Sequence, residues 1–215
     1  DRSPSRGLGD VYKRQGGKTI SLWFNKSAQE GNPLFVDRLF TFFQSSNAST
    51  GLSIGIKNNK FILIFKNKSG VLHQLPIIKK FANNKWNHFA LTYNNSFITL
   101  YLNGSKLLDK YNEKIAEFGD FPAKIGAFTW NHGFKGKIDE FAFYKASFNK
   151  KQIKDLYNNG MTQDLSLGVK KNKLAAWYRL GDHESDSIYH VEDLAGNNSG
   201  KPRVDNEFSF STSAP

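Results

Sequence analysis

Two pairs of adjacent carboxylates, Asp139-Glu140 and Glu192-Asp193, are the residues of this chain best suited to acid–base chemistry. Cleavage of a glycosidic bond with retention needs two carboxyl groups about 5 Å apart, which one strand supplies at positions i and i+2. Neighbours on a strand face opposite sides, and Glu192-Asp193 lie beside the turn-rich stretch "DLAGNNSG". The sequence therefore predicts no catalytic residues and no enzyme.

Two histidines have different surroundings. His88 lies in "WNHFALTY", where no Ser, Cys or second His stands at a matching position, so it is predicted to be a structural residue that is hydrogen-bonded within its sheet. His132 lies in "FTWNHGF" beside the turn-forming Gly133. An aromatic ring next to amide and imidazole groups suits sugar recognition, so Trp130, Asn131 and His132 are predicted to bind ligand in an exposed loop. That Trp130 covers the core is an equal alternative.

The stretch "DRLFTFFQSSNAST" offers a second aromatic group. Phe40 and Phe42 share one face of a strand, which indicates core residues. Asp37 and Arg38 before them are predicted to be an exposed pair or a rim contact.

Composition limits the class of protein. The 215 residues are 39% hydrophobic and 14% aromatic with no Cys, so the chain is globular, lacks disulfides and contains no apolar run of the about 20 residues that a membrane helix needs. The net charge of +11 could attract a polyanion. The better interpretation is an A/T-rich genome, because the lysines are scattered along the sequence and no nucleic-acid-binding motif is present. Neither a nucleic-acid nor a membrane partner is expected.

The first residues differ from the rest. "GDVYKRQGG" contains Asp10-Val11-Tyr12-Lys13-Arg14-Gln15, which resembles the translation of a transposase end used in sequencing libraries. Residues 1–15 are therefore predicted to be a non-native adapter scar. The N-terminal strands of the domain are then expected to be missing.

From residue 19 to 144 the pattern is short alternating strands separated by turn residues, including Asn58-Asn59 and Asn103-Gly104. This pattern predicts an all-β, antiparallel two-sheet sandwich. One short helix is expected at 149–158, capped by Asn149 with Gln152 and lying on the sandwich edge. A polar connector at 161–173 then leads to a C-terminal appendage, 174–215, whose strand "KLAAWYRLG" and turn-rich loop are predicted to dock on the sandwich. The alternatives are the first strand of a second copy of the domain and a flexible connector to a further domain.

The ordered set "KWNHFALTY", "ITLYLNGSKL", "KIGAF" and "FKGKIDEFAFYKASFNKKQIKDLYNNG" resembles the laminin-G-like, concanavalin A-like family over most of residues 19–160, and the domain is predicted to span residues 16–160. The resemblance implies a jelly roll that binds carbohydrate or protein surfaces. It also implies that a structural calcium ion can be held by Asp139, with Asp193 and Asn197 completing the ligand set. The favoured alternative is that Asp139 hydrogen-bonds backbone groups at the sheet edge.

The tail is similar to segments of predicted structural proteins of marine phages. The function expected is a non-catalytic carbohydrate-binding or adhesion module of a phage structural or secreted protein, extracellular or virion-associated, with a glycan partner and possible assembly with other virion or adhesin subunits. A purely structural virion domain without ligand, or a fragment of a polysaccharide-active enzyme, are the alternatives.

Overall fold

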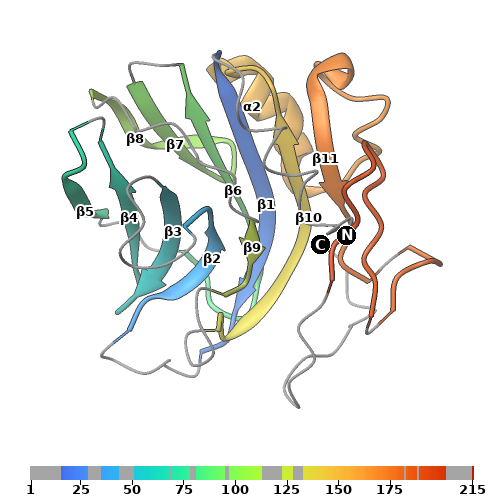
Figure 1. Cartoon of the computed structure of the whole chain (residues 1–215), viewed down its shortest axis with the longest axis horizontal. Helices are drawn as coiled ribbons and strands as arrows, with labels where there is room; N and C mark the ends of the chain where they lie inside the picture. Colours follow the sequence, from blue (N-terminus) through green and yellow to red (C-terminus); the bar gives the residue numbers. More distant parts are fainter. Residues whose placement is uncertain are drawn as a thin grey trace, which may run out of the picture.

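The computed structural model describes residues 16–28, 35–43, 51–67, 69–77, 81–94, 97–112, 123–127, 133–181, 183–187, 189–201 and 215. Two antiparallel sheets lie face to face (Figure 1). The six-stranded sheet has the order β11-β10-β1-β6-β7-β8, from β1 (Lys18–Lys26), β6 (Trp86–Tyr93), β7 (Phe97–Leu102), β8 (Ser105–Asn112), β10 (Gly136–Tyr144) and β11 (Leu174–Tyr178). The five-stranded sheet has the order β5-β4-β3-β2-β9, from β2 (Asp37–Thr41), β3 (Leu52–Lys57), β4 (Lys60–Lys66), β5 (Leu72–Ile77) and β9 (Lys124–Ile125). The predicted all-β jelly-roll sandwich is confirmed.

Two predicted hairpin turns have the expected backbone. Asn58 and Asn59 join β3 to β4 with φ of 50° and 55°, and Asn103 and Gly104 join β7 to β8 with φ of 49° and 71°. Type I′ turns require positive φ at both central residues, which Asn and Gly adopt at little cost. These turns fix the register of both strand pairs.

The core fills the space between the sheets with aromatic side chains. Phe24 of β1 meets Phe61 of β4 edge to face with 5.8 Å between ring centroids, and Phe40 meets Phe141 at 6.1 Å. Phe40 and Phe42 are buried as predicted. Burying a side chain of this size contributes about 2–3 kcal/mol, so these pairs hold the two sheets together.

A second apolar cluster covers the outer face of the six-stranded sheet. There Ile153 and Leu156 of α2 (Lys150–Tyr157) are buried with Ala90, Ala142 and Tyr144. The capping box is present as predicted, since Asn149 and Gln152 exchange two hydrogen bonds of 3.0 Å. The predicted position on the sandwich edge is wrong, because the outer sheet face is itself apolar and α2 covers it. No helix within the described part of the chain is long and apolar enough to cross a membrane.

The C-terminal segment adds an edge strand to the sandwich. β11 pairs with β10, with Ala142 opposite Trp177 and Phe143 opposite Ala176. Between α2 and β11 the chain forms η1 (Asn158–Gly160) and η2 (Lys171–Lys173). The segment that joins these two short helices contains the buried Leu165. At the other side of β10 lies β1, which also pairs with β6. The division of the chain into domains stays a prediction.

Candidate functional site

The loop between β9 and β10 is closed at its base. The backbone N–H of Phe134 donates to the carbonyl of Gly126 at 2.7 Å, and the N–H of Gly126 donates to Leu39 at 2.9 Å. The two ends of this loop are therefore held together where the chain passes from the five-stranded sheet to the six-stranded sheet. Trp130, Asn131 and His132, which lie within this loop, are outside the described residues.

A buried ion pair ties the two sheets together beside this loop. The ammonium of Lys26 on β1 lies 3.2 Å from a carboxylate oxygen of Asp37 on β2, with side chains only 6% and 11% exposed. The same nitrogen lies 6.0 Å from the centroid of the Phe134 ring. The prediction of an exposed Asp37–Arg38 pair is wrong, because Asp37 pairs with Lys26 and Arg38 donates to Ser53 Oγ at 2.8 Å. Opening this end would leave buried charges unpaired, so the pair keeps it closed.

Polar and aromatic groups surround the base of the loop. The Oδ1 of Asn84 accepts the N–H of Ala28 at 3.1 Å, and the N–H of Asn84 donates to Lys26 at 2.8 Å. Lys85 and Lys135 are exposed, as is Phe35, two residues before Asp37. We call this end of the sandwich the loop end and define it by Phe35, Asn84, Lys85, Gly126 and Phe134–Lys135. It offers hydrogen-bonding groups and two aromatic rings, of which that of Phe35 is exposed.

Ser21 and His88 form the pair that most resembles catalytic machinery. Ser21 Oγ lies 2.8 Å from His88 Nε2, yet both residues are buried in the middle of the six-stranded sheet. Burial lowers the pKa of His88 to about 3, and its Nδ1 has no hydrogen-bond partner among the described residues. A general base works best with a pKa near the operating pH and with an orienting acid behind it. The pair is thus structural, as predicted for His88.

A β-bulge in β10 places the Glu140 carboxylate beside the same small pocket as His88. The register against β1 shifts between Ser21 and Trp23, and Glu140 takes the left-handed conformation with φ of 51°. Asp139 Oδ1 accepts the N–H of Glu140 at 2.7 Å. A non-glycine residue in this conformation costs about 1–2 kcal/mol, so the bulge is held by its contacts.

The Glu140 carboxylate is buried and paired. Its Oε2 accepts the indole N–H of Trp177 at 2.5 Å, and its Oε1 lies 3.5 Å from the Nε of Arg179. A small pocket beside it is lined by Ser21, Trp23, His88, Glu140, Leu156, Thr162, Gln163 and Leu165. Sequence reasoning missed this group, because an acidic residue within a strand gives no sign of a bulge.

Asp193 organises the loop that follows β11. Its Oδ1 accepts the N–H groups of Trp177 at 2.9 Å and Ala195 at 3.1 Å, and its Oδ2 accepts the N–H of Asn198 at 3.2 Å. The adjacent Asn197 is exposed. Burial raises the pKa of Tyr178, and the nearby negative charge of Asp193 raises it further.

The predicted calcium ligands Asp139 and Asp193 have other partners in this structure. Asp139 and Asp193 already accept backbone N–H groups, and the described residues contain no group of three or more His, Asp and Glu side chains able to hold a metal ion. Calcium takes six or more oxygen ligands, so backbone carbonyls and further groups would have to join these three residues. Calcium binding by Asp139, Asp193 and Asn197 stays a prediction.

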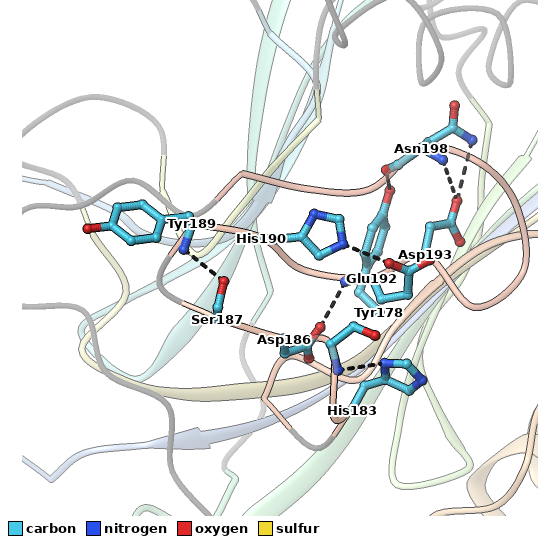
Figure 2. A network of polar contacts seen from close by, with 10 residues as sticks. Tyr178, His183, Asp186, Ser187, Tyr189, His190, Glu192, Asp193 and Asn198 are labelled. Carbon is cyan, nitrogen blue, oxygen red and sulfur yellow. Dashed lines mark hydrogen bonds and ion pairs between the residues drawn. The ribbon is translucent and has the colours of Figure 1, made fainter.

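Figure 2 shows the polar contacts of the C-terminal loop. His190 Nε2 lies 2.7 Å from Glu192 Oε2, and Asp186 Oδ1 accepts the N–H of Glu192 at 2.8 Å. The ring of Tyr189 points away from this network and is 72% exposed. The loop is internally bonded and presents one aromatic side chain to solvent, which makes it the second candidate for a binding surface.

The sequence matches a family model over most of its length. A family model described as the Concanavalin A-like lectin/glucanases superfamily matches residues 8–154, which is more than half of the chain. The chain belongs to this family. The match begins inside residues 1–15, whose origin as an adapter stays a prediction.

Solved structures with the same fold include several binding domains. A Bacteroides ovatus protein described as carbohydrate binding is 20% identical, with a TM-score of 0.59 over 86% of this chain and 50% of that one. Domain 4 of AbnA, an extracellular arabinanase from Geobacillus stearothermophilus solved with arabinotriose, is 21% identical, with a TM-score of 0.53 over 66% of each chain. At these identities the likeness shows the fold.

Curated relatives are much longer than this chain. Pappalysin-1 from Mus musculus is 19% identical over 66% of this chain, and the human protein is 20% identical over 79%. The chain spans only 10% and 12% of those two proteins.

Proposed function

We propose that this chain is a non-catalytic carbohydrate-binding module that attaches its parent to a glycan. The proposal rests mainly on the closed base of the β9–β10 loop, where the backbone N–H of Phe134 donates to the carbonyl of Gly126 at 2.7 Å. Holding the two ends of a binding segment in place lowers the entropy that the segment loses when it binds a ligand. The proposed contacts are Trp130, Asn131 and His132, with the loop end as their rim. The family and the binding domains that share the fold support this function.

The absence of catalytic chemistry is also part of the proposal. Glu140 is engaged by Trp177 and Arg179, and His88 is buried with a pKa of about 3. A histidine with so low a pKa is a weak general base at neutral pH. We place the parent protein outside the cell or on a phage particle, where adhesion to a glycan has a use.

A glycan array followed by affinity gel electrophoresis tests this function. Trp130→Ala is expected to abolish binding to the glycan that the native chain retains, because the ring supplies the flat apolar contact. Tyr189→Ala is the matched control, since it removes an exposed ring from the C-terminal loop. Binding lost only with Tyr189→Ala would move the site to that loop. No binding to any glycan would favour a purely structural domain, and released sugar would contradict the non-catalytic assignment.

A further inference from the structure

The sequence contains two Asn-Gly pairs, Asn103-Gly104 and Asn159-Gly160. In an Asn-Gly pair the backbone can attack the asparagine side chain, because glycine carries no Cβ that would hinder the approach of its nitrogen. The fold places these two identical pairs in different surroundings. Their reactivities can therefore be compared within one molecule.

Asn103 is held by hydrogen bonds of both its side chain and its backbone. Its Oδ1 accepts the backbone N–H of His88 at 2.8 Å, and its Nδ2 donates to Oδ1 of Asn87 at 3.3 Å. Its backbone N–H donates to the carbonyl of His88 at 2.8 Å. The following Gly104 is buried, and a Cβ there would lie 2.9 Å from the ring of Tyr157. This hairpin turn cannot rearrange without breaking these contacts.

Asn159 lies just after the end of α2 and is exposed. Within the described part of the chain its side chain makes no hydrogen bond. Its backbone is left-handed, with φ of 54° and ψ of 26°. The hydrogen bond that spans the turn, from the N–H of Met161 to the carbonyl of Asn158, measures 3.2 Å. Exposed stretches with few buried contacts open more readily than paired strands, so this turn is the more mobile of the two.

We propose that Asn159 is a site of spontaneous deamidation. The backbone nitrogen of Gly160 gives up its proton and attacks Cγ of Asn159, and the side-chain NH₂ takes up a proton and leaves as ammonia. The five-membered cyclic imide that results then adds one water molecule. Opening of the ring at one carbonyl gives aspartate, and opening at the other gives isoaspartate. No electrons are exchanged, and water is the co-reactant.

The difference in restraint decides which pair reacts. Attack requires the glycine nitrogen to approach the asparagine Cγ, and a turn that is free to rotate reaches this arrangement more often than a turn that is held. A misplacement of about 1 Å between reacting groups can cost about 100-fold in rate. Two hydrogen bonds hold the amide of Asn103, whereas the described residues offer none to that of Asn159. Asn159 is therefore the pair expected to react.

Both products alter the end of α2. A carboxylate at position 159 adds negative charge at the C-terminus of a helix, where the helix dipole is itself negative. Isoaspartate also lengthens the main chain by one atom before Gly160. Gln163 caps this helix end, since its Nε2 donates to the carbonyls of Asp155 and Leu156 at 2.9 and 3.1 Å. Either product should loosen this cap.

The end of α2 also covers the middle of the six-stranded sheet. The ring of Tyr157 lies 5.9 Å from that of Trp23 and 5.8 Å from that of His88, measured between centroids. Leu156 and Gln163 line the small pocket that contains His88. A looser helix end would expose this buried group to water, so a deamidated chain is expected to be less stable than a fresh one. This site goes beyond the proposed function and does not depend on it.

Incubation of the full chain at mildly alkaline pH, followed by tryptic digestion and tandem mass spectrometry, tests the proposal. The two pairs fall in different tryptic peptides, residues 86–106 and residues 155–170, so each is measured separately. Methylation by protein isoaspartyl methyltransferase detects the isoaspartate product. In the folded chain Asn159 is expected to react about 100-fold faster than Asn103. In concentrated urea, where neither turn is held, the two rates should become similar.

Two variants separate the reaction from its consequence. Asn159→Gln keeps an amide on a longer side chain that closes a ring slowly, so the signal at position 159 should disappear. Asn159→Asp represents one product and is expected to lower the midpoint of thermal unfolding by about 1–4 °C. Asn59→Asp is the matched control, because Asn59 is also exposed and left-handed, with φ of 55°, but lies in a hairpin turn. Its midpoint should stay close to that of the native chain.

Four results would contradict these expectations. Reaction at Asn103 as fast as at Asn159 in the folded chain would overturn the proposal, because the fold would then protect neither pair. No reaction at Asn159 under conditions where the unfolded chain reacts would also overturn it, as would isoaspartate at Asn158 in its place. Equal midpoints for Asn159→Asp and Asn59→Asp would overturn the loosening of α2. None of these measurements involves a glycan, so their failure is distinct from failure of the proposed function.

Discussion

Ser21 Oγ and His88 Nε2 lie 2.8 Å apart on neighbouring strands, in a region that excludes water from the imidazole. The rings of Trp23 and Tyr157 pack against His88, with centroids 5.1 and 5.8 Å from it. Because of this burial the pKa of His88 falls to about 3 in the folded chain, whereas an unfolded chain has a value of about 6.5. The neutral imidazole is therefore the form on which folding depends.

This relationship predicts acid sensitivity. Below about pH 6.5 His88 is protonated in the unfolded chain but stays neutral in the folded chain. The contribution of His88 to the free energy of unfolding is therefore complete above this pH and is lost as the pH falls towards 3. Between about pH 6.5 and about pH 4.5 the expected loss from His88 is about 2–3 kcal/mol. Urea unfolding at several pH values measures it. His88→Gln, which can keep a nitrogen near Ser21, should flatten the dependence.

The matched control is His183→Asn in the C-terminal loop. This substitution should leave the pH dependence as steep as in the native chain, because it does not alter His88 or the residues that bury it. A His88→Gln variant with an unchanged pH slope would show that other groups cause the acid sensitivity.

The bulge at Glu140 should be held by Trp177. Trp177→Phe removes the indole donor and leaves a buried carboxylate oxygen without that partner, which should cost about 1–3 kcal/mol. Glu140→Gln keeps the shape but weakens the contact with Arg179. In a double-mutant cycle the two changes should couple by more than about 0.5 kcal/mol, as groups in one network do. Additive effects would mean that the bulge is held without this hydrogen bond.

Much of this fold is predictable from local sequence. Asn58-Asn59 and Asn103-Gly104 set two hairpins because these residues tolerate positive φ. Asn149 and Gln152 set the start of α2 by a capping box that involves only neighbouring residues. In each case the cause lies within four residues of the effect.

Contacts between distant segments were not predictable in the same way. The sequence around Asp37 predicts an exposed residue, because nothing in it shows that the packing of the two sheets brings Lys26 beside Asp37. Glu140 becomes a buried partner of Trp177, 37 residues later, only because β11 joins β10 and a bulge redirects the chain. The backbone contact between Lys145 and Lys173 likewise joins two segments that are far apart in the sequence. Tertiary pairing, which local pattern does not encode, decides all three.

Gly196 should resist substitution. A Cβ at this position would lie 2.8 Å from Asp193 Oδ2 and 3.1 Å from the carbonyl of Ala175. Gly196→Ala is therefore expected to lower the free energy of unfolding by about 1–3 kcal/mol, as overpacking does. Gly168→Ala is the control, since its Cβ would meet its nearest atoms at 3.6 Å. Thermal unfolding compares them, and equal midpoints for both variants would contradict the crowding.

The outer edge of β11 should be protected by Asp193. The N–H of Trp177 donates to Asp193 Oδ1 at 2.9 Å, and the N–H of Leu194 donates to the Trp177 carbonyl at 2.9 Å, so the loop covers an edge that would otherwise be open to pairing with another chain. In the native chain the amides of β11 should exchange slowly, as docking on β10 requires. Asp193→Ala should speed exchange at Trp177 about tenfold or more, whereas Ala176, opposite Phe143, should change less because successive amides of a strand point to opposite sides. Hydrogen exchange followed by NMR resolves the two amides. Equal acceleration at both would mean that Asp193 holds the whole strand in place, and no acceleration at either would show that the edge needs no cover from this carboxylate.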